Sequence, residues 1–91
     1  MENSNDLAVD GNAMAGPLAE VFSVDVTTAQ VTCDHCGAAN PLAAEKAYVR
    51  GPGLVLRCVG CSSVLARLVK ARDAIWLDFR GSTTWQIRAL G

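Results

Sequence analysis

The sequence contains two short cysteine-rich segments, CDHCG at residues 33–37 and CVGCS at residues 58–62. Each stretch contains a Cys-x2-Cys pair, and 21 residues separate the two pairs. Zinc binds four ligands in a tetrahedron, and a two-residue spacer allows one tight turn to aim both thiolates at the same metal. The spacing therefore predicts one structural Zn2+ ion per chain, held by Cys33, Cys36, Cys58 and Cys61.

The 21 intervening residues are predicted to form a hairpin that returns the second cysteine pair to the first, as in a zinc ribbon. Residues 51–53, which read GPG, supply the turn. Gly37 follows the first pair and suits a knuckle in which backbone N–H groups point at sulfur and the chain then takes a positive φ. Ser62 follows the second pair, so the two knuckles need not be identical.

The four cysteines also admit other chemistries. Disulfides are rare in cytosolic proteins, and a redox dithiol needs a cysteine pair at a helix N-terminus, whereas both pairs here follow predicted strands. Iron binds four thiolates tetrahedrally, as in a rubredoxin-like site. We interpret His35, inside the first pair, as a solvent-facing spacer, with a swapped ligand or a partner contact as the alternatives.

The composition favours a small, braced domain without catalytic activity. A chain of 91 residues buries only about 60–65 % of its surface on folding. A single histidine and no glycine-rich phosphate loop argue against an enzyme, so no small-molecule substrate is expected. No apolar run of about 18 residues and no basic N-terminal region occur, so we expect a cytoplasmic protein that does not contact membranes.

Charge is distributed unevenly along the chain. Residues 1–45 contain seven acidic and no basic side chains, whereas residues 46–91 contain eight basic and two acidic ones. Such asymmetry indicates either an acidic partner such as nucleic acid or two halves that fold against one another and neutralise each other.

Three regions are expected along the chain. Residues 1–9 are polar and without periodicity, and we predict them to be disordered. Residues 10–23 are predicted to form a short helix packed on or near the ribbon, and residues 24–91 to form the four-cysteine zinc-ribbon domain. The expected fold is a small, mostly β, metal-stabilised domain with antiparallel hairpins and a short N-terminal helix.

The predicted helix carries an apolar stripe. Asp10 or Asn12 can cap its start, and Pro17 either lies in its first turn or kinks it. The stripe is formed at helical spacing by Met14, Leu18, Val21 and Phe22. It either packs onto the core or, through Leu18, Val21 and Phe22, docks a partner protein.

Strand signals dominate the ribbon domain. Alternation and β-branched residues predict strands over residues 24–32, 46–50, 54–57, 63–70, 74–80 and 83–88. The stretch from Leu42 favours either a helical turn or a strand, and we expect a strand from about Lys46. Residues 71–73 are predicted to close a hairpin.

The second arm of that hairpin alternates clearly. Residues 75–80 set Ile, Leu and Phe on one side and Trp, Asp and Arg on the other. Arg67, Trp76 and Arg80 are therefore expected to share a face, which puts cations beside an aromatic platform and suits nucleic acid. A sequence pI of about 5.6 and the few aromatic residues argue against that partner.

A longer pattern combines DGNA at residues 10–13, GPLAEVF at residues 16–22, the two cysteine pairs and WLDFRG at residues 76–81. The knuckles resemble those of the zinc-ribbon superfamily, and the full pattern is similar to a family of small actinobacterial zinc-ribbon proteins of unknown function. The resemblance covers nearly all of residues 10–91. It implies a zinc-ribbon fold with a zinc site at the four cysteines, and it implies no reaction.

Three functions follow from these patterns. We interpret the chain first as a non-enzymatic protein-interaction adaptor, in which the acidic N-terminal region and the helix stripe engage an unknown partner protein. The alternative is a nucleic-acid-binding ribbon, associated with transcription or translation, that uses the basic hairpin. A thiol redox or zinc-buffering role is a further alternative; it predicts fast metal exchange, whereas a structural site releases zinc only on unfolding.

Overall fold

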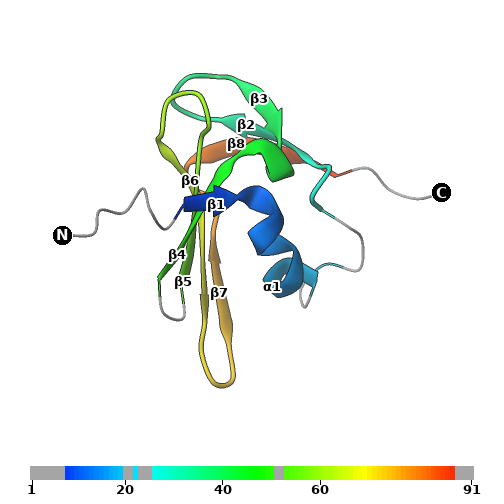
Figure 1. Cartoon of the computed structure of the whole chain (residues 1–91), viewed down its shortest axis with the longest axis vertical. Helices are drawn as coiled ribbons and strands as arrows, with labels where there is room; N and C mark the ends of the chain where they lie inside the picture. The colour runs from blue at the N-terminus through cyan, green and yellow to red at the C-terminus, as the bar shows by residue number, and fades with distance from the viewer. Residues whose placement is uncertain (1–7, 20–21, 23–25, 51–52, 88–91) are drawn as a thin grey trace.

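Two antiparallel sheets form the framework of the chain (Figure 1). The computed structural model describes residues 8–19, 22, 26–50 and 53–87. The larger sheet has the order β1-β4-β5-β6-β7, with strands Ala8–Asp10 (β1), Lys46–Arg50 (β4), Gly53–Arg57 (β5), Val64–Lys70 (β6) and Ile75–Asp78 (β7). The smaller sheet has the order β3-β2-β8, with strands Ala39–Pro41 (β3), Gln30–Cys33 (β2) and Ser82–Gln86 (β8).

The β5–β6 pairing shows why the apolar alternation produces this sheet. Leu54 pairs with Leu68, and Leu56 pairs with Ala66, so all four side chains are buried on the same face. A register shift after Leu56 allows Leu65 to turn inward as well, and Leu65 and Ala66 are therefore buried in succession. The predicted hairpins β4–β5 and β6–β7 are confirmed.

The predicted N-terminal helix is present as two short segments, the 3-10 helix Gly11–Met14 (η2) and the α-helix Ala15–Ala19 (α1). The carboxylate of Asp10 caps the first segment and accepts a hydrogen bond from the Asn12 N–H at 3.1 Å. Pro17 lies in the first turn of α1. Figure 1 shows both segments on one side of the large sheet. Residues 20, 21 and 23 of the predicted helix lie outside the described residues.

The prediction of disorder is wrong for Ala8 and Val9. Both belong to β1, which pairs with β4 and places Ala8 opposite Tyr48. Without β1, β4 would be an edge strand with unpaired backbone groups, and the extended residues 8–10 satisfy those groups. Residues 1–7 of the same prediction lie outside the described residues.

The predicted strand over residues 24–32 is wrong in its first half. Thr27 and Thr28 form a turn, closed by a hydrogen bond from the Ala29 N–H to the Val26 carbonyl at 3.0 Å. Val26 is buried, so its apolar character reflects core packing rather than an extended strand. Residues 23–25 lie outside the described residues, and β2 begins at Gln30.

The stretch from Leu42 contains both of its predicted alternatives in succession. Leu42–Ala44 form a 3-10 turn (η3), and β4 begins at Lys46. No sequence pattern predicted β3, the strand that precedes this turn and pairs with β2.

The core is built mainly from aliphatic side chains. Its buried apolar members are Met14, Leu18, Val26, Ala29, Val31, Cys33, Leu42, Ala47, Leu54, Leu56, Cys58, Leu65, Ala66 and Leu68. Ile75, Leu77 and Phe79 pack against this cluster, as the alternation along β7 predicts. Across the described residues, no helix is long and apolar enough to cross a membrane.

Candidate metal centre

The four predicted ligands meet where the two sheets approach one another. Cys33 ends β2 in the small sheet, and Cys58 directly follows β5 in the large sheet. Cys36 and Cys61 lie in the turns that follow. The four Sγ atoms all lie within 4.8 Å of one another.

The sulfur separations suit a tetrahedral metal ion. The Sγ atoms of Cys33 and Cys61 are 3.7 Å apart, as are those of Cys36 and Cys58. Metal–sulfur bonds of about 2.3 Å place the sulfurs of a tetrahedron about 3.8 Å apart. As the spacing predicted, the four cysteines form one cluster that can hold a metal ion, and tetrahedral thiolates accept either zinc or iron.

The two knuckles have the same pattern of backbone hydrogen bonds, although one follows a strand of the small sheet and the other a strand of the large sheet. In the first, the Gly37 N–H donates to the Cys33 carbonyl at 2.9 Å. In the second, the Ser62 N–H donates to the Cys58 carbonyl, also at 2.9 Å. Cys33 and Cys58 in turn donate their N–H groups to residues 38 and 63 at 2.9 and 2.8 Å. The two cysteine pairs are therefore related turns, although their sequences differ.

Each knuckle ends on a residue with positive φ. Gly37 has a φ of 78°, as predicted, and Ser62 has a φ of 68° at the equivalent position. This region of backbone space favours glycine, because it crowds the Cβ atom of other residues. The geometry of the site therefore requires Ser62 to adopt a conformation that its side chain opposes.

Hydrogen bonds to sulfur favour the thiolate form that binds metal. The Cys36 N–H donates to Cys33 Sγ at 3.5 Å, and the Gly60 N–H donates to Cys58 Sγ at 3.4 Å. Hydrogen bonds from the Ser63 hydroxyl and backbone hold the pKa of Cys61 at about 6, below the ordinary range of a thiol.

Cys36 is shifted the other way. A backbone hydrogen bond with Ala38 lowers the pKa of Cys36, but loss of hydration and hydrogen bonding with the three other cysteines raise it to about 11. A metal ion bound by all four sulfurs would favour the thiolate form of each cysteine.

Two charged residues brace the second knuckle. Glu45 is 1 % exposed, and its Oε1 accepts a hydrogen bond from the Val59 N–H at 2.9 Å. Its Oε2 has no hydrogen-bond partner within the described residues, and burial raises the pKa of this carboxyl. Arg57 donates from Nη1 to the Ser62 carbonyl at 2.8 Å and lies over the Tyr48 ring, 5.8 Å from its centroid.

Sequence reasoning missed the role of Glu45, because nothing in the run Ala-Ala-Glu-Lys distinguishes a buried carboxylate from an exposed one. Arg57 contacts the second knuckle through its hydrogen bond to the Ser62 carbonyl. His35 is exposed on the first knuckle, and the cluster found in the described residues consists of cysteine sulfurs.

Of the hairpin residues predicted to share a face, Arg67 and Trp76 do so, whereas Arg80 lies beyond the end of β7. Val69 pairs with Trp76, and Arg67 pairs with Asp78, which places all four on the same side of the large sheet. Arg67, Trp76 and Arg80 line one open hollow of about 540 Å³. The structure therefore brings these three residues together, and their role in binding stays a prediction.

The helix stripe is not a free surface. Leu18 is 0 % exposed and belongs to the core, and Phe22 is half-buried against it. Val21 lies outside the described residues. The described members of the stripe, Met14, Leu18 and Phe22, thus pack onto the core, the first of the two predicted roles.

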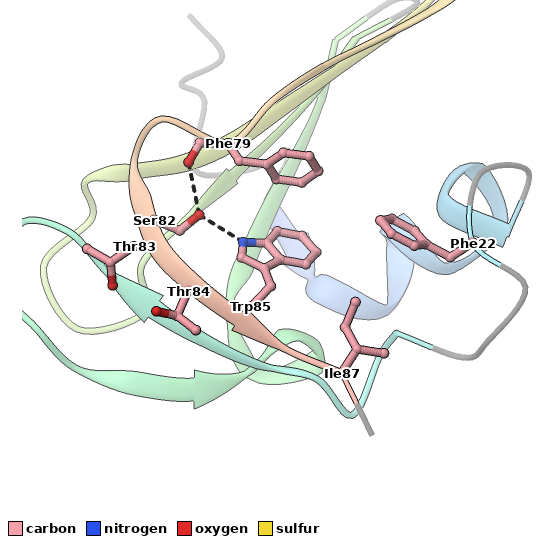
Figure 2. A pocket seen from close by; sticks show the side chains of 7 residues that line it. All are labelled: Phe22, Phe79, Ser82, Thr83, Thr84, Trp85 and Ile87. Atoms are coloured by element: carbon pink, nitrogen blue, oxygen red, sulfur yellow. Dashed lines mark hydrogen bonds between the residues drawn. The ribbon is translucent and has the colours of Figure 1, made fainter. Parts of the chain in front are cut away.

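Phe22 also borders a cavity of about 270 Å³ that the sequence did not indicate. It is lined by Phe22, Phe79, Ser82, Thr83, Thr84, Trp85 and Ile87. Figure 2 shows Phe22 facing the pair formed by Phe79 and Trp85, whose rings meet edge to face with centroids 4.9 Å apart. The Ser82 hydroxyl donates to the Phe79 carbonyl at 3.0 Å and accepts from Trp85 Nε1 at 2.8 Å (Figure 2). The lining comes from segments far apart in the chain, which explains why no local motif revealed it.

Comparison with known proteins gives a family match. A model described as a family of unknown function, DUF6510, matches residues 2–90. No curated protein matches the chain, and no solved structure matches it. The predicted resemblance to a family of unknown function is confirmed, whereas an actinobacterial source stays a prediction. The chain belongs to the family of unknown function DUF6510.

Proposed function

We propose that this chain is a non-enzymatic binding module whose fold is held together by one structural zinc ion. One observation carries the proposal: four cysteine sulfurs converge at tetrahedral spacing from two knuckles of the same form. Closed four-thiolate sites of this kind are typical of structural zinc in small domains. The knuckles belong to different sheets, so zinc would join the small sheet to the large one.

The coordination supports a structural role rather than a catalytic one. A catalytic zinc keeps one position open for water or substrate, whereas four thiolates fill the tetrahedron. Two of the ligands, Cys33 and Cys58, are buried in the core. We therefore expect no small-molecule substrate at the metal. A cytoplasmic location suits the proposal, since thiolate ligands persist where thiols are kept reduced.

A partner is proposed to meet the exposed side of the large sheet, opposite its core face. Burial of Leu18 leaves an adaptor contact through the helix stripe without support. By contrast, Arg67, Trp76 and Arg80 are all exposed and lie around one hollow. The second candidate function, nucleic-acid binding, is therefore better supported by the geometry than a protein adaptor that uses the helix.

Metal content and metal release test the structural zinc. We expect one zinc ion per purified chain. Because release of a structural zinc requires unfolding, a chromogenic chelator should take up the zinc no faster than the most protected backbone amides exchange with deuterium. Release many times faster than this exchange would support zinc buffering and contradict the proposal. An iron-containing protein would also contradict it.

A further inference from the structure

We infer that the exposed side of the large sheet binds single-stranded nucleic acid, with Trp76 as the stacking platform for a base and Arg67 as a phosphate contact. The inference rests on the proposed function, since it names the partner of the binding module. We call this surface the outer face and define it by Tyr48, Val55, Arg67, Val69 and Trp76.

Strand register determines which side chains form the outer face. Tyr48 lies opposite Val55, Val55 opposite Arg67, and Val69 opposite Trp76, so these side chains project to the same side of the sheet. The intervening residues project to the other side, where the core lies. Neighbouring strands lie about 4.8 Å apart, so the face extends about 14 Å from β4 to β7.

The outer face offers aromatic and apolar surface to solvent. Trp76 is 67 % exposed and Val69 is 40 % exposed, whereas Trp85 is half-buried with its indole N–H hydrogen-bonded. An exposed indole on the outer side of a sheet can present its ring to a planar partner. Nucleobases stack on aromatic side chains, whatever their sequence, because every base has a π-face.

Cations lie among these apolar groups. Arg67 is exposed at the centre of the face, directly between Val55 and Asp78. Arg57 lies one row away beside Tyr48, with its guanidinium held by the Ser62 carbonyl and the Tyr48 ring. A guanidinium fixed in this way loses little entropy when it binds a phosphate.

Two carboxylates near the face each lie on or beside a strand position that also carries a cation. Asp78 accepts hydrogen bonds from Arg80 Nε at 3.0 Å and Arg80 Nη2 at 2.6 Å, which keeps the pKa of Asp78 at about 2. Asp10 lies opposite Lys46 at the β1 edge. The formal charges of Asp78 and Asp10 are equalled by those of Arg80 and Lys46, so Arg57 and Arg67 leave the outer face positive, although the whole chain carries a net charge of -1. The charge and the exposed ring together are complementary to a polyanion with unpaired bases.

The exposed ring favours a single strand over a duplex. In a duplex the base faces are hidden in the stack, so an indole on a sheet finds a partner ring only in an unpaired base. The two unbalanced cations suit contact with a few phosphates, which predicts modest affinity and a shallow dependence on salt.

Fluorescence anisotropy with the zinc-loaded full chain tests the inference. Labelled single strands of about 12 nucleotides, DNA and RNA, are titrated at low salt, and a duplex of the same length and polyglutamate are titrated beside them. We expect the single strands to bind more tightly than either control. A duplex that binds as tightly as the single strands would overturn the inference. Polyglutamate binding that depends on Arg67 and Trp76 would also overturn it, because the partner of the outer face would then be an acidic protein.

Four variants locate the contact. Trp76→Leu is expected to weaken binding about tenfold, whereas Trp76→Phe keeps a ring and stays within about threefold of the wild type. Arg67→Ala is expected to weaken binding and to reduce the slope of log K against log salt by about 0.7. Arg72→Ala removes an exposed cation of the β6–β7 loop, outside the outer face, and is expected to change affinity less than Arg67→Ala does.

Zinc content and the amide spectrum of each variant separate a lost contact from a lost fold. A folded, zinc-loaded chain that binds no single strand would overturn the inference and leave the proposed module intact. A folded chain without zinc would overturn the proposed function itself.

Discussion

At the residue scale, the second knuckle places a serine where glycine fits more easily. Ser62 has a φ of 68°, close to the 78° of its counterpart Gly37. The left-handed region costs an L-residue roughly 1–2 kcal/mol, and the greater backbone entropy that glycine loses on folding offsets part of this difference. The hydrogen bonds of Ser62 that we describe, with Cys58 and Arg57, use only its backbone.

Ser62→Gly is therefore expected to raise the free energy of unfolding by about 0.5–1 kcal/mol. Urea denaturation at fixed free zinc measures the change. Gly60→Ala is the matched control within the same knuckle, because an added Cβ meets its nearest neighbour, Cys58 Sγ, at 3.8 Å, an ordinary contact. A Ser62→Gly variant less stable than the wild type would show that the positive φ carries no strain.

Glu45 makes stability depend on pH. Burial raises the pKa of its carboxyl, so the folded chain binds this proton more tightly than the unfolded chain does. The charged carboxylate therefore destabilises the folded chain most at pH values above the raised pKa. This destabilisation declines as the pH falls toward 4.5, the usual pKa of a glutamate side chain. Glu45→Gln keeps an oxygen for the Val59 N–H but removes the charge.

We expect the free energy of unfolding of Glu45→Gln, minus that of the wild type, to increase as the pH rises from about 5 to about 8. The increase is at most about 1.4 kcal/mol per pH unit. Denaturation at fixed free zinc measures this difference. Both proteins have the same four cysteines, so the contribution of the thiols cancels in the difference. Asp73→Asn, which removes an exposed carboxylate, is measured beside it as the control. A Glu45→Gln difference that stays flat would contradict the account.

At the scale of elements, η2 and α1 are part of the core rather than a separate docking segment. Met14 and Leu18 are 1 % and 0 % exposed, and the Phe22 N–H donates to the Leu18 carbonyl at 2.8 Å. This packing accounts for the predicted helical stripe without any partner.

Leu18→Ala is expected to lower the free energy of unfolding by about 2–4 kcal/mol, as truncation of a buried leucine does. Thermal denaturation of the zinc-loaded protein provides the measurement. Val59→Ala truncates a side chain that is 42 % exposed and is expected to change stability by about 0.5 kcal/mol or less. A Leu18→Ala effect as small as that of the control would mean that the helix is not held by the core.

The elements that could be predicted are those specified by short-range patterns. Two Cys-x2-Cys spacings predict the ligand set, because a tight turn fixes both sulfurs of each pair locally. The alternation over residues 75–80 predicts which side of β7 faces the core, and Gly37 indicates the positive φ of the first knuckle.

The remaining features depend on contacts between distant segments. β1 forms because residues 8–10 pair with residues 46–48, and no local pattern records that pairing. Val26 is apolar because it is buried in the core, and this apolar position resembles part of a strand pattern although a turn follows it. The positive φ of Ser62 is set by the equivalent hydrogen bonds of the two knuckles rather than by the residue itself.

At the scale of the whole molecule, the four-cysteine cluster is a junction between the two sheets. The first knuckle ends β2 of the small sheet, and the second follows β5 of the large sheet. Close to the first knuckle, the Asp34 N–H donates to the Gly81 carbonyl at 2.9 Å, in the link from β7 to β8. Structural zinc contributes about 10–16 kcal/mol in small peptides, as much as the whole stability of a typical domain. Loss of the metal should therefore separate the sheets and unfold the chain.

The most direct test is native mass spectrometry of the protein purified without added metal, with circular dichroism before and after chelation. We predict one zinc ion per chain and loss of the β signal when a chelator removes it, with the same loss in Cys58→Ser. A chain that carries no metal, or one that keeps its structure in chelator with two oxidised cysteine pairs, would contradict the claim that zinc holds this fold together.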